Sequence, residues 1–521
     1  MQATPTAWIA TASATATALG ATDVDLVRQY AVSLLLAILA TALFTPVLLL
    51  LYRSRIGAWM GRSAGAAPPL AVLERAGAVA LPPLPELLHR SRHGVRTRAR
   101  AWLLGFGVQA LLLALLFAAR YSEQLSPGAW LLALGVLLLP AALILLSVST
   151  ASGWSRLLVV GLALLALSRW PGLTGELVRQ VAELHVGLPL VPLVLFHLRF
   201  WRGAAPLVFL LALVGFHGWM LGLGLATGVL GIGAGAGLWL ARLVGLAMGL
   251  AVGGWILRAV AARHARGSLS DQAFNLESWW LLYTLVQAFV ATSGLGLGAG
   301  VVALLSFLLG RWVVELLLRR STLPSREPHR LLLLRVFGNS RRSERLFEQL
   351  VQAWNPLGSI ELIGGTDLAL QHVAPLDFLA FLTGRLGERF GEAPGETAAR
   401  LASAPNRAVD GSYAARQTFC PADGWEATMR QLLAASDAVV MDLRDFRAER
   451  TGCRLELEAL ARSGSRRPLV LVTDASTDLA LLRNVLQAAG ADPDQPPWRL
   501  VPAAPREAGT VGRVLAAIAG A

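Results

Sequence analysis

Long apolar stretches dominate the first 320 residues and decide what this chain can fold into. A helix that crosses a bilayer needs about 20 mostly apolar residues, and seven stretches approach or exceed that length. Two shorter stretches, 157–168 and 188–197, are weaker candidates that can tilt or form a re-entrant pair. We therefore expect an α-helical transmembrane bundle over 31–320, with nine spans or with seven and a re-entrant hairpin. The seven are 31–52, 101–119, 129–147, 205–230, 232–257, 279–295 and 298–318.

The arginines predict how this bundle is oriented. The formal net charge of +13 would by itself suggest a nucleic-acid-binding protein. However, residues 1–320 hold 23 Arg against 10 Asp and Glu, whereas residues 321–521 hold 23 of each. Cytoplasmic loops of membrane proteins are enriched in basic residues, and the loop predicted at 53–100 carries nine arginines. We therefore expect a multi-pass protein of the cell membrane with residues 1–30 as a flexible external tail, a cytosolic C-terminus and no nucleic-acid partner.

The basic loop at 53–100 has two interpretations. It either serves only as a solvated flank that sets the topology, or it binds the anionic head groups of lipids. The sequence leaves both open.

Small and ionisable residues within the spans indicate helix packing more than transport. Arg242 lies in mid-span, where it either pairs locally or faces a neighbouring helix. Arg311 and Glu315 are four residues apart and are expected to pair along one helix face. Glycines spaced by four let helix backbones approach closely, either within one chain or between the chains of a homo-oligomer. The pattern occurs at Gly245/Gly249/Gly253, Gly224/Gly228, Gly231/Gly235, Gly233/Gly237, Gly294/Gly298 and Gly296/Gly300.

A polar linker at 321–330 separates the bundle from a half with a different pattern, residues 331–521. Short apolar runs alternate there with amphipathic stretches, which is typical of a parallel sheet covered by helices on both faces. We expect one three-layer α/β domain of the doubly wound, TIR- or flavodoxin-like type. The predicted strands are 331–337, 359–363, 437–443, 467–473 and 498–502, and the predicted helices are 343–354, 375–390, 425–435, 453–461, 477–489 and 510–518.

Ligands of doubly wound sheets bind beyond the carboxyl ends of the strands. Loops that contain glycine and arginine can hold phosphates at such an edge, although neither glycine loop here matches a Walker or Rossmann fingerprint. The alternative is that all four loops serve only as turns and helix caps. The loop residues are Gly338, Asn339, Ser340, Arg341 and Arg342; Gly364, Gly365, Thr366 and Asp367; Arg444, Asp445, Phe446 and Arg447; and Asp474, Ala475, Ser476 and Thr477.

The stretch SDAVVMDLRDFRAERTGCRLELEAL, followed by RRPLVLVTDAS, resembles the third and fourth strands of a TIR (Toll/interleukin receptor) domain. In TIR domains the helix between these strands often opens with Cys-x-x-Glu-Leu, and here it reads Cys453-Arg454-Leu455-Glu456-Leu457. LRVFGNSRRSERLFEQL is similar to the first TIR strand, loop and helix, and IELIGGTDLAL to the second strand and the loop that closes over the ligand. One departure is an insert of about 65 residues, 371–435, before the third strand.

The resemblance implies a function for the cytosolic half. In TIR domains that cleave NAD the glutamate of this helix is catalytic, so the resemblance assigns that role to Glu456 and makes NAD a substrate or ligand, with no tightly bound cofactor. It also implies ligand contacts for Cys453 and for the loops at 338–341 and 364–367. A carboxylate close to the ribose stabilises an oxocarbenium-like transition state, and Arg341, Arg342 or Arg447 can hold the pyrophosphate. The alternative for Glu456 is a solvated helix residue paired with an arginine.

Two classes of function follow from these observations. The first is a membrane-anchored signalling protein whose TIR-like domain binds or cleaves a nucleotide and assembles into homo-oligomers. The second is a transporter or membrane scaffold whose α/β domain is a non-catalytic regulatory or protein-binding module.

Overall fold

The computed structural model describes most of both halves of the chain. The described residues are 23–61, 81–121, 134–135, 137–138, 204–228, 230–265, 271–320, 328–335, 341–364, 373, 375–390, 401, 405, 407–408, 412–420, 425–464, 467–504 and 506–520. Most of the predicted tail and linker, most of the span at 129–147, and the spans at 157–168 and 188–197 lie outside these residues.

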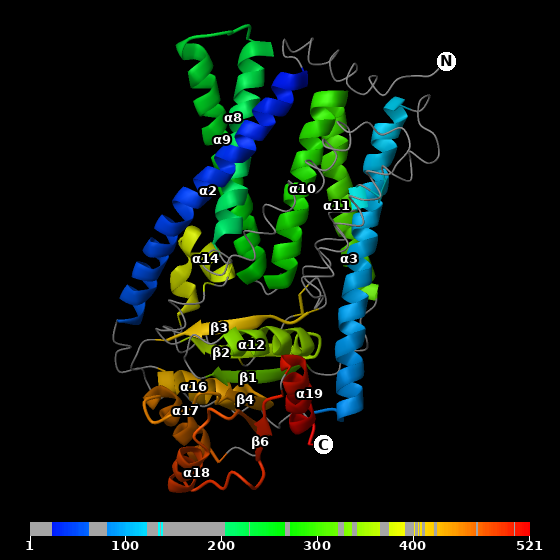
Figure 1. The fold of residues 1–521 in the computed structure, drawn as a ribbon. Coiled ribbons are helices and arrows are strands. Elements are labelled where there is room, and N and C mark those ends of the chain that lie inside the picture. Colours follow the sequence, from blue (N-terminus) through cyan, green and yellow to red (C-terminus); the bar gives the residue numbers. More distant parts are fainter. Residues whose placement is uncertain are drawn as a thin grey trace.

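Six long helices make up the bundle in the described part of the chain. They are α2 (Asp23–Met60), α3 (Leu84–Tyr121), α8 (Ala205–Gly228), α9 (Ala236–Ala265), α10 (Asp271–Leu295) and α11 (Leu297–Arg320). Figure 1 shows α8 and α9 as one hairpin and α10 and α11 as another, both above the α/β half, whereas the lower part of α3 runs down beside that half. Helices α2 and α3 extend into the loop predicted at 53–100, so the basic residues from 84 to 100 are helical.

Five of these helices contain a stretch that is long and apolar enough to cross a membrane, judged by length and composition. The stretches are Leu35–Met60, Leu84–Leu116, Ala205–Thr227, Ala236–Arg263 and Gly298–Arg320. Helix α10 covers the span predicted at 279–295 but is not among the five. The described residues are therefore compatible with a membrane protein and contain fewer spans than the seven to nine predicted. The other three predicted stretches fall mainly outside them.

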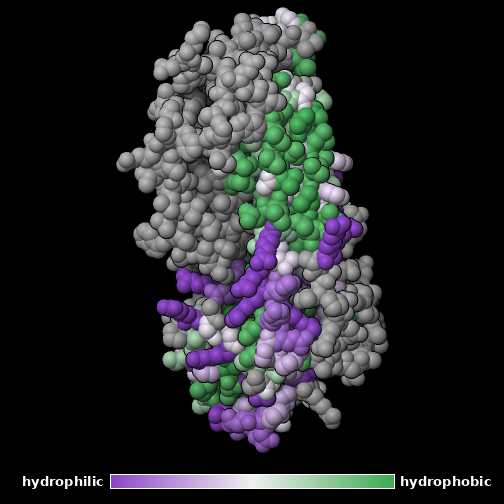
Figure 2. All heavy atoms as spheres, turned by 90° about the vertical axis from the view of Figure 1, so that its right-hand side faces the viewer, coloured by the Kyte–Doolittle hydropathy of each residue, from purple (hydrophilic) through white to green (hydrophobic). Residues whose placement is uncertain are grey.

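The outer surface of the bundle is apolar. Leu50 of α2 is 65% exposed and Trp255 of α9 is 68% exposed, and Figure 2 shows a broad apolar surface on the face that it draws. Soluble monomers rarely expose contiguous apolar patches of this kind, whereas lipid tails cover them without cost. The exposed side chains thus agree with the membrane reading of the sequence.

Glycines hold α8 and α9 close together. A Cβ at Gly249 would lie 2.5 Å from the backbone oxygen of Val214, and one at Gly218 would lie 2.9 Å from the Cα of Gly249. Gly245 abuts the backbone of Gly218 in the same way. The close packing predicted for the Gly245 stripe is confirmed, and its partner is a helix of the same chain. Gly224, by contrast, has open space within 4 Å of its Cβ position among the described residues.

Aromatic rings hold Arg242, which the sequence placed in mid-span and which lies in the second turn of α9. The guanidinium carbon of Arg242 lies 5.7 Å from the ring centroid of Trp219 on α8 and 5.4 Å from that of Trp239 on α9. A cation over an aromatic face is attracted by the ring quadrupole. Arg242 therefore faces a neighbouring helix, which is one of the two arrangements expected from the sequence.

The predicted pair between Arg311 and Glu315 is wrong. Arg311 Nε instead donates to Glu277 Oε1 at 3.2 Å, and Glu277 Oε2 accepts from Arg263 at 3.2 Å. Glu315 pairs with Arg319. Sequence spacing shows only neighbours on one helix, whereas Glu277 on α10 reaches arginines on α9 and α11. The tertiary pair thus replaces the local one.

The α/β half contains the predicted parallel sheet. Its strands are β1 (His329–Arg335), β2 (Gly358–Gly364), β3 (Ala415–Phe419), β4 (Ala438–Asp442), β5 (Leu469–Thr473) and β6 (Trp498–Pro502). They are all parallel, in the order β3-β2-β1-β4-β5-β6. β4 and β5 are buried along their whole length, as expected for central strands covered on both faces. Figure 1 shows β3 as the strand nearest the bundle and β6 as the farthest.

Helices cover both faces of this sheet and confirm the three-layer architecture. α12 (Arg341–Trp354) and α19 (Glu507–Ile518) pack on one face. α16 (Trp425–Ala435), α17 (Thr451–Arg462) and α18 (Leu479–Ala488) pack on the other. The lower end of α3 belongs to the first face, because Leu87 is fully buried in the same cluster as α12 and α19. A single helix therefore runs from the bundle to the sheet.

The insert before β4 supplies a second connection between the halves. It contains α14 (Pro375–Leu382), the 3₁₀ turn η2 (Leu386–Arg389) and β3. Phe378 of α14 is fully buried, and its ring lies 5.8 Å from that of Tyr52 on α2. Burying one phenylalanine contributes about 1.5–3 kcal/mol. The insert thus docks on the end of the bundle that faces the α/β half.

The single helix predicted over 375–390 is wrong, because α14 ends at Leu382. Gly384 has a φ of +75°, and Arg385 N donates to Ala380 O at 2.7 Å while Gly384 N donates to Phe381 O at 3.1 Å. These two bonds are those of a Schellman motif, which ends a helix at a left-handed glycine. The break directs η2 and Phe390 toward β3.

Candidate functional site

The strand order locates the candidate site at the carboxyl ends of β1 and β4. The chain leaves β1 toward β2 and leaves β4 toward β5, on opposite sides, so the order reverses between these two strands. Doubly wound sheets bind ligands at such a switch point. Arg335 and Asp442, the last residues of β1 and β4, are register partners there.

The loop that follows β1 was predicted to hold phosphates. Gly338, Asn339 and Ser340 lie outside the described residues, and α12 begins at Arg341. The N-terminus of a helix attracts anions because its first N–H groups are unpaired and its dipole is positive there. Gly364 is the last residue of β2, and Gly365 and Asp367 lie outside the described residues.

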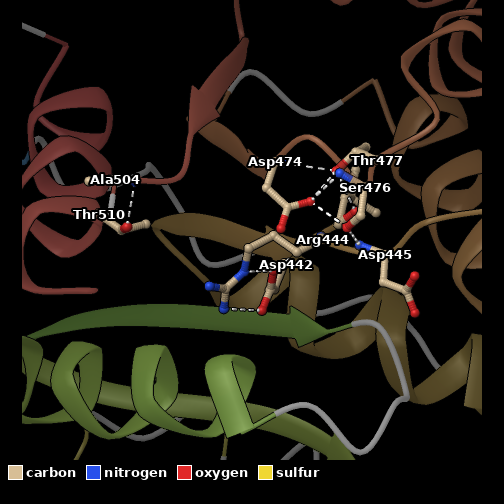
Figure 3. Close-up of polar contacts among 9 residues, drawn as sticks. Asp442, Arg444, Asp445, Asp474, Ser476, Thr477, Ala504 and Thr510 are labelled. Atoms are coloured by element: carbon tan, nitrogen blue, oxygen red, sulfur yellow. Dashed lines mark hydrogen bonds and ion pairs between the residues drawn. The ribbon is translucent and has the colours of Figure 1, made fainter. Parts of the chain in front are cut away.

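A buried ion pair closes the end of β4. Arg444 donates from Nε to Asp442 Oδ1 and from a terminal nitrogen to Asp442 Oδ2, both at 2.8 Å, as Figure 3 shows. Asp442 is 2% exposed and Arg444 is 6% exposed. Leaving one member of a buried pair without its partner costs about 3–5 kcal/mol. Arg444 is therefore a structural member of the loop, and sequence reasoning did not identify Asp442.

The loop after β5 is tied to the loop after β4. Asp474 Oδ1 accepts from the hydroxyl of Ser476 at 2.6 Å and from its backbone N–H at 2.9 Å. Ser476 Oγ accepts from the N–H of Asp445 at 3.0 Å, and Thr477 Oγ1 donates to Leu443 O at 3.0 Å (Figure 3). Asp478 caps α18 by accepting from Leu481 N. For this loop the turn-and-cap interpretation accounts for every polar side chain named.

The charge of Asp474 follows from these bonds. Burial, the largest single effect, raises the pKa of Asp474, but the two hydrogen bonds from Ser476 and the nearby Arg444 together lower it below its ordinary value. Asp474 is thus ionised near neutral pH and helps to fix the edge on which the candidate site lies. In the adjacent loop, Thr510 Oγ1 accepts from Ala504 N at 2.9 Å and orients the start of α19.

Arg447 lies at the rim of the site. Its Nε is 3.2 Å from Asp445 Oδ1, and its side chain is 61% exposed. Asp445 also pairs with Arg450 at 3.0 Å and has a φ of +63°, in the left-handed region. An exposed pair of this kind contributes at most about 1 kcal/mol. Arg447 can therefore exchange Asp445 for a ligand phosphate at little cost.

Glu456 lies on the buried stripe of α17. The buried residues of this helix are Cys453, Glu456, Leu457 and Leu460. Cys453 is 1% exposed and belongs to the same apolar cluster as the two leucines. Glu456 is 4% exposed, and its Oε2 has no hydrogen-bond partner among the described residues. The solvated, arginine-paired alternative for Glu456 is therefore wrong. Its neighbour Glu458 has that role, pairing with Arg454 and Arg462.

The surroundings of Glu456 keep it neutral. Burial raises the pKa of Glu456 to about 8. Burial, and secondarily the charge of Glu456, raise the pKa of the Cys420 thiol to about 12, so these two side chains lie near each other. At pH 7 only about one tenth of such a carboxyl is ionised. Without a ligand, Glu456 is mainly a hydrogen-bond donor.

A row of aromatic rings joins this region to the bundle. Trp59 of α2 stacks on Phe390 with ring centroids 5.4 Å apart, and Phe390 lies 5.5 Å from Phe419, the last residue of β3. Cys420 follows directly. The C-terminal end of α2 thus reaches the neighbourhood of Glu456 through two phenylalanines.

Comparisons of the chain with protein-family models, with curated proteins and with solved structures found no match in any of the three.

Proposed function

We propose that this chain is an integral membrane signalling protein whose cytosolic α/β half is a TIR-like domain that binds a dinucleotide of the NAD class. One observation carries the proposal. A buried carboxyl, Glu456, lies near Cys420 at the carboxyl end of β3, in a parallel sheet whose strand order reverses between β1 and β4, and its Oε2 has no partner among the described residues. An unpartnered buried carboxyl costs free energy, and such groups concentrate at functional sites.

The strand order supports the TIR-like assignment. With β3 of the insert set aside, the other strands run β2-β1-β4-β5-β6. Numbered in chain order this is 2-1-3-4-5, the order of flavodoxin-like sheets. The insert adds its strand at the edge beside β2 and leaves the switch point between β1 and β4 in place.

The basic residues support the orientation. Arg55 at the end of α2, Arg92 and Arg96 near the start of α3, and Arg319 and Arg320 at the end of α11 all lie at the end of the bundle that faces the α/β half. By the positive-inside rule this end is cytosolic. We therefore assign an external N-terminus, a cytosolic α/β half and a multi-pass bundle of seven or nine spans in the cell membrane.

In this proposal the ligand changes the state of Glu456. The nicotinamide ring of oxidised NAD carries a positive charge, and an opposite charge within about 4–6 Å lowers the pKa of a carboxyl. The bound cation thus favours the carboxylate that an oxocarbenium-like transition state requires. The pyrophosphate lies at the N-terminus of α12, with Arg447 at the rim.

The neutral state of Glu456 favours a second version of this function, a sensor that binds the dinucleotide without cleaving it. Transport has no part in the proposal, because Arg242 and Arg311, the arginines predicted within the spans, are engaged with aromatic rings and with Glu277.

The test uses the full chain in detergent micelles, because α3 and α14 connect the two halves. Thermal unfolding with and without NAD measures binding, and release of nicotinamide measures cleavage. We expect NAD to stabilise the protein and Glu456→Gln to abolish cleavage. Glu458→Gln, two residues further along α17 and paired on the surface, should retain cleavage. Cleavage should increase from pH 6 to about pH 8 as the carboxyl ionises. Binding without cleavage supports the sensor, and the absence of both overturns the proposal.

A further inference from the structure

The exposed basic residues of α3 and α11 form one surface, which we call the arginine stripe. It consists of Arg92, Arg96 and Arg100 on α3 and Arg319 and Arg320 on α11, all exposed. The three on α3 are four residues apart, so they lie on one helix face. Arg98 points inward and is 8% exposed. Figure 2 shows hydrophilic side chains directly below the apolar surface on the face that includes α3.

The arginine stripe begins where the apolar surface ends. Leu103 and Leu104 of α3 are 50% and 54% exposed, and Trp312 of α11 is 58% exposed. Both helices thus change from exposed apolar to exposed basic residues within about two turns. This change marks the border between the hydrocarbon core and the head groups, a border where tryptophan is also enriched.

The packing of the two helices places Arg96 of α3 and Arg319 of α11 at the same depth. Helices α3 and α11 are antiparallel and touch at Gly105 and Gly310, where a Cβ at Gly310 would lie 2.7 Å from the Gly105 oxygen. Arg96 and Arg319 are each nine residues from that contact on their own helices. At 1.5 Å per residue, both lie about 13 Å below it. Arg100 is about 6 Å higher than Arg96, and Arg92 is about 6 Å lower.

This depth range matches a lipid head-group layer. The polar region of a bilayer adds about 5–7 Å on each side of the hydrocarbon core. Charges just outside it act over a Debye length of about 8 Å. Carboxylates of these two helices offset only one charge of the arginine stripe. Glu315, the one acidic residue of α11, pairs with Arg319, and Glu86, the one acidic residue of α3, pairs with Arg90 outside the stripe.

We infer that the arginine stripe binds anionic glycerophospholipids of the cytosolic leaflet, with the guanidinium groups on the lipid phosphates. Guanidinium forms paired hydrogen bonds with phosphate oxygens, and the apolar side chains above the stripe contact the acyl chains. This inference rests on the membrane placement and orientation proposed above, and it does not depend on the dinucleotide.

The test titrates the detergent-solubilised full chain with short-chain phosphatidylglycerol, short-chain phosphatidylcholine or inorganic phosphate, and follows thermal unfolding. The variant is Arg92→Gln/Arg96→Gln/Arg100→Gln. The matched control is Arg483→Gln/Arg499→Gln/Arg513→Gln, which removes the same charge from exposed positions of the α/β half. A second variant, with lysine at positions 92, 96 and 100, keeps the charge if the glutamine variant fails to fold.

We expect phosphatidylglycerol to stabilise the wild type and the control at the same concentration, and phosphatidylcholine to have no comparable effect. Each basic residue near an anionic surface contributes about fivefold in affinity, so the glutamine variant should need at least tenfold more phosphatidylglycerol. The lysine variant should need less than the glutamine variant. Equal titrations for all variants would overturn the inference, as would stabilisation by inorganic phosphate at the same concentrations.

Extraction of membranes with alkaline carbonate separates this inference from the proposed function. Release of the chain from the membrane contradicts the membrane placement itself. Retention of the chain together with equal lipid titrations contradicts only the arginine stripe as a lipid site.

Discussion

At the scale of single residues, Glu456 is an ionisable side chain that is buried on the apolar face of α17. Burial raises its pKa from 4.5 to about 8, so the folded protein binds this proton more tightly than the unfolded chain does. A group whose pKa is raised by folding contributes fully to the stability of the fold at pH values below its pKa in the unfolded chain. This contribution is lost as the pH increases through its pKa in the folded protein. Glu456 therefore makes the fold progressively less stable between about pH 4.5 and pH 8.

A Glu456→Gln variant should remove this pH dependence, because the neutral amide resembles the protonated carboxyl in size and charge. We expect the stability of the variant relative to wild type to increase by about 1.4 kcal/mol per pH unit between pH 5 and pH 8, and to level off above. Thermal unfolding of the full chain across this range measures it. Glu458→Gln serves as control, since Glu458 is paired at the surface. If the difference in stability between Glu456→Gln and wild type does not change with pH over this range, the pKa of Glu456 is not raised by folding.

The sequence identified Glu456 but not its surroundings. The Cys-x-x-Glu-Leu pattern selects the residue, whereas its neighbour Cys420 comes from a distant segment, the end of β3 in the insert. Pattern reasoning also paired Arg311 with Glu315, because only neighbours on one helix are visible in a sequence. The true partner, Glu277, lies on a different helix.

At the scale of helices and strands, short apolar runs and amphipathic stretches located the helices and five of the six strands of the α/β half, whereas β3 was not among the predicted strands. The helix over 425–435 and the strand over 498–502 agree with α16 and β6 at both ends. The break at Gly384 was missed, because the apolar pattern continues across it while the backbone adopts a positive φ. The order of the strands depends on contacts between distant segments, and the sequence pattern does not contain it.

The close approach of the α8 and α9 backbones requires glycine at their contact. Replacing Gly218 with alanine should push the two helices apart, because the new Cβ would overlap with the Gly245 oxygen and lie 2.9 Å from the Gly249 Cα. We expect a lower unfolding temperature in detergent, with a loss of about 1–3 kcal/mol as for other overpacked sites.

Gly224→Ala on the same helix is the matched control for this prediction. Its Cβ meets open space among the described residues, and alanine favours helix over glycine by up to about 1 kcal/mol. The control should therefore be neutral or slightly stabilising. Equal losses in both variants would mean that general helix perturbation, and not the contact with α9, causes the effect.

At the scale of the whole molecule, two connections join the bundle to the sheet. Helix α3 packs its lower end on the face that carries α12 and α19, with Gly94 so close to Pro356 that a Cβ would lie 2.7 Å from the proline Cβ. The insert packs α14 and Phe390 against Tyr52 and Trp59 of α2. The first contact lies on the face that carries α12 and α19 and the second at the β3 edge, so a movement of α2 relative to α3 would act at that edge.

The two cysteines of the chain provide a probe of that edge. Cys420 and Cys453 are both buried and form no disulfide in the described part of the chain, and Cys420 directly follows Phe419 in the row that begins at Trp59. In a Cys453→Ser background, maleimide labelling of Cys420 reports how often this edge opens. Trp59→Ala removes the ring stacked on Phe390, and we expect it to increase the labelling rate severalfold. Trp255→Ala, which removes a lipid-facing ring that is 68% exposed, should leave the rate unchanged. Equal rates in the two tryptophan variants would mean that α2 does not control the neighbourhood of Glu456, and that the bundle acts on the α/β half through α3 alone.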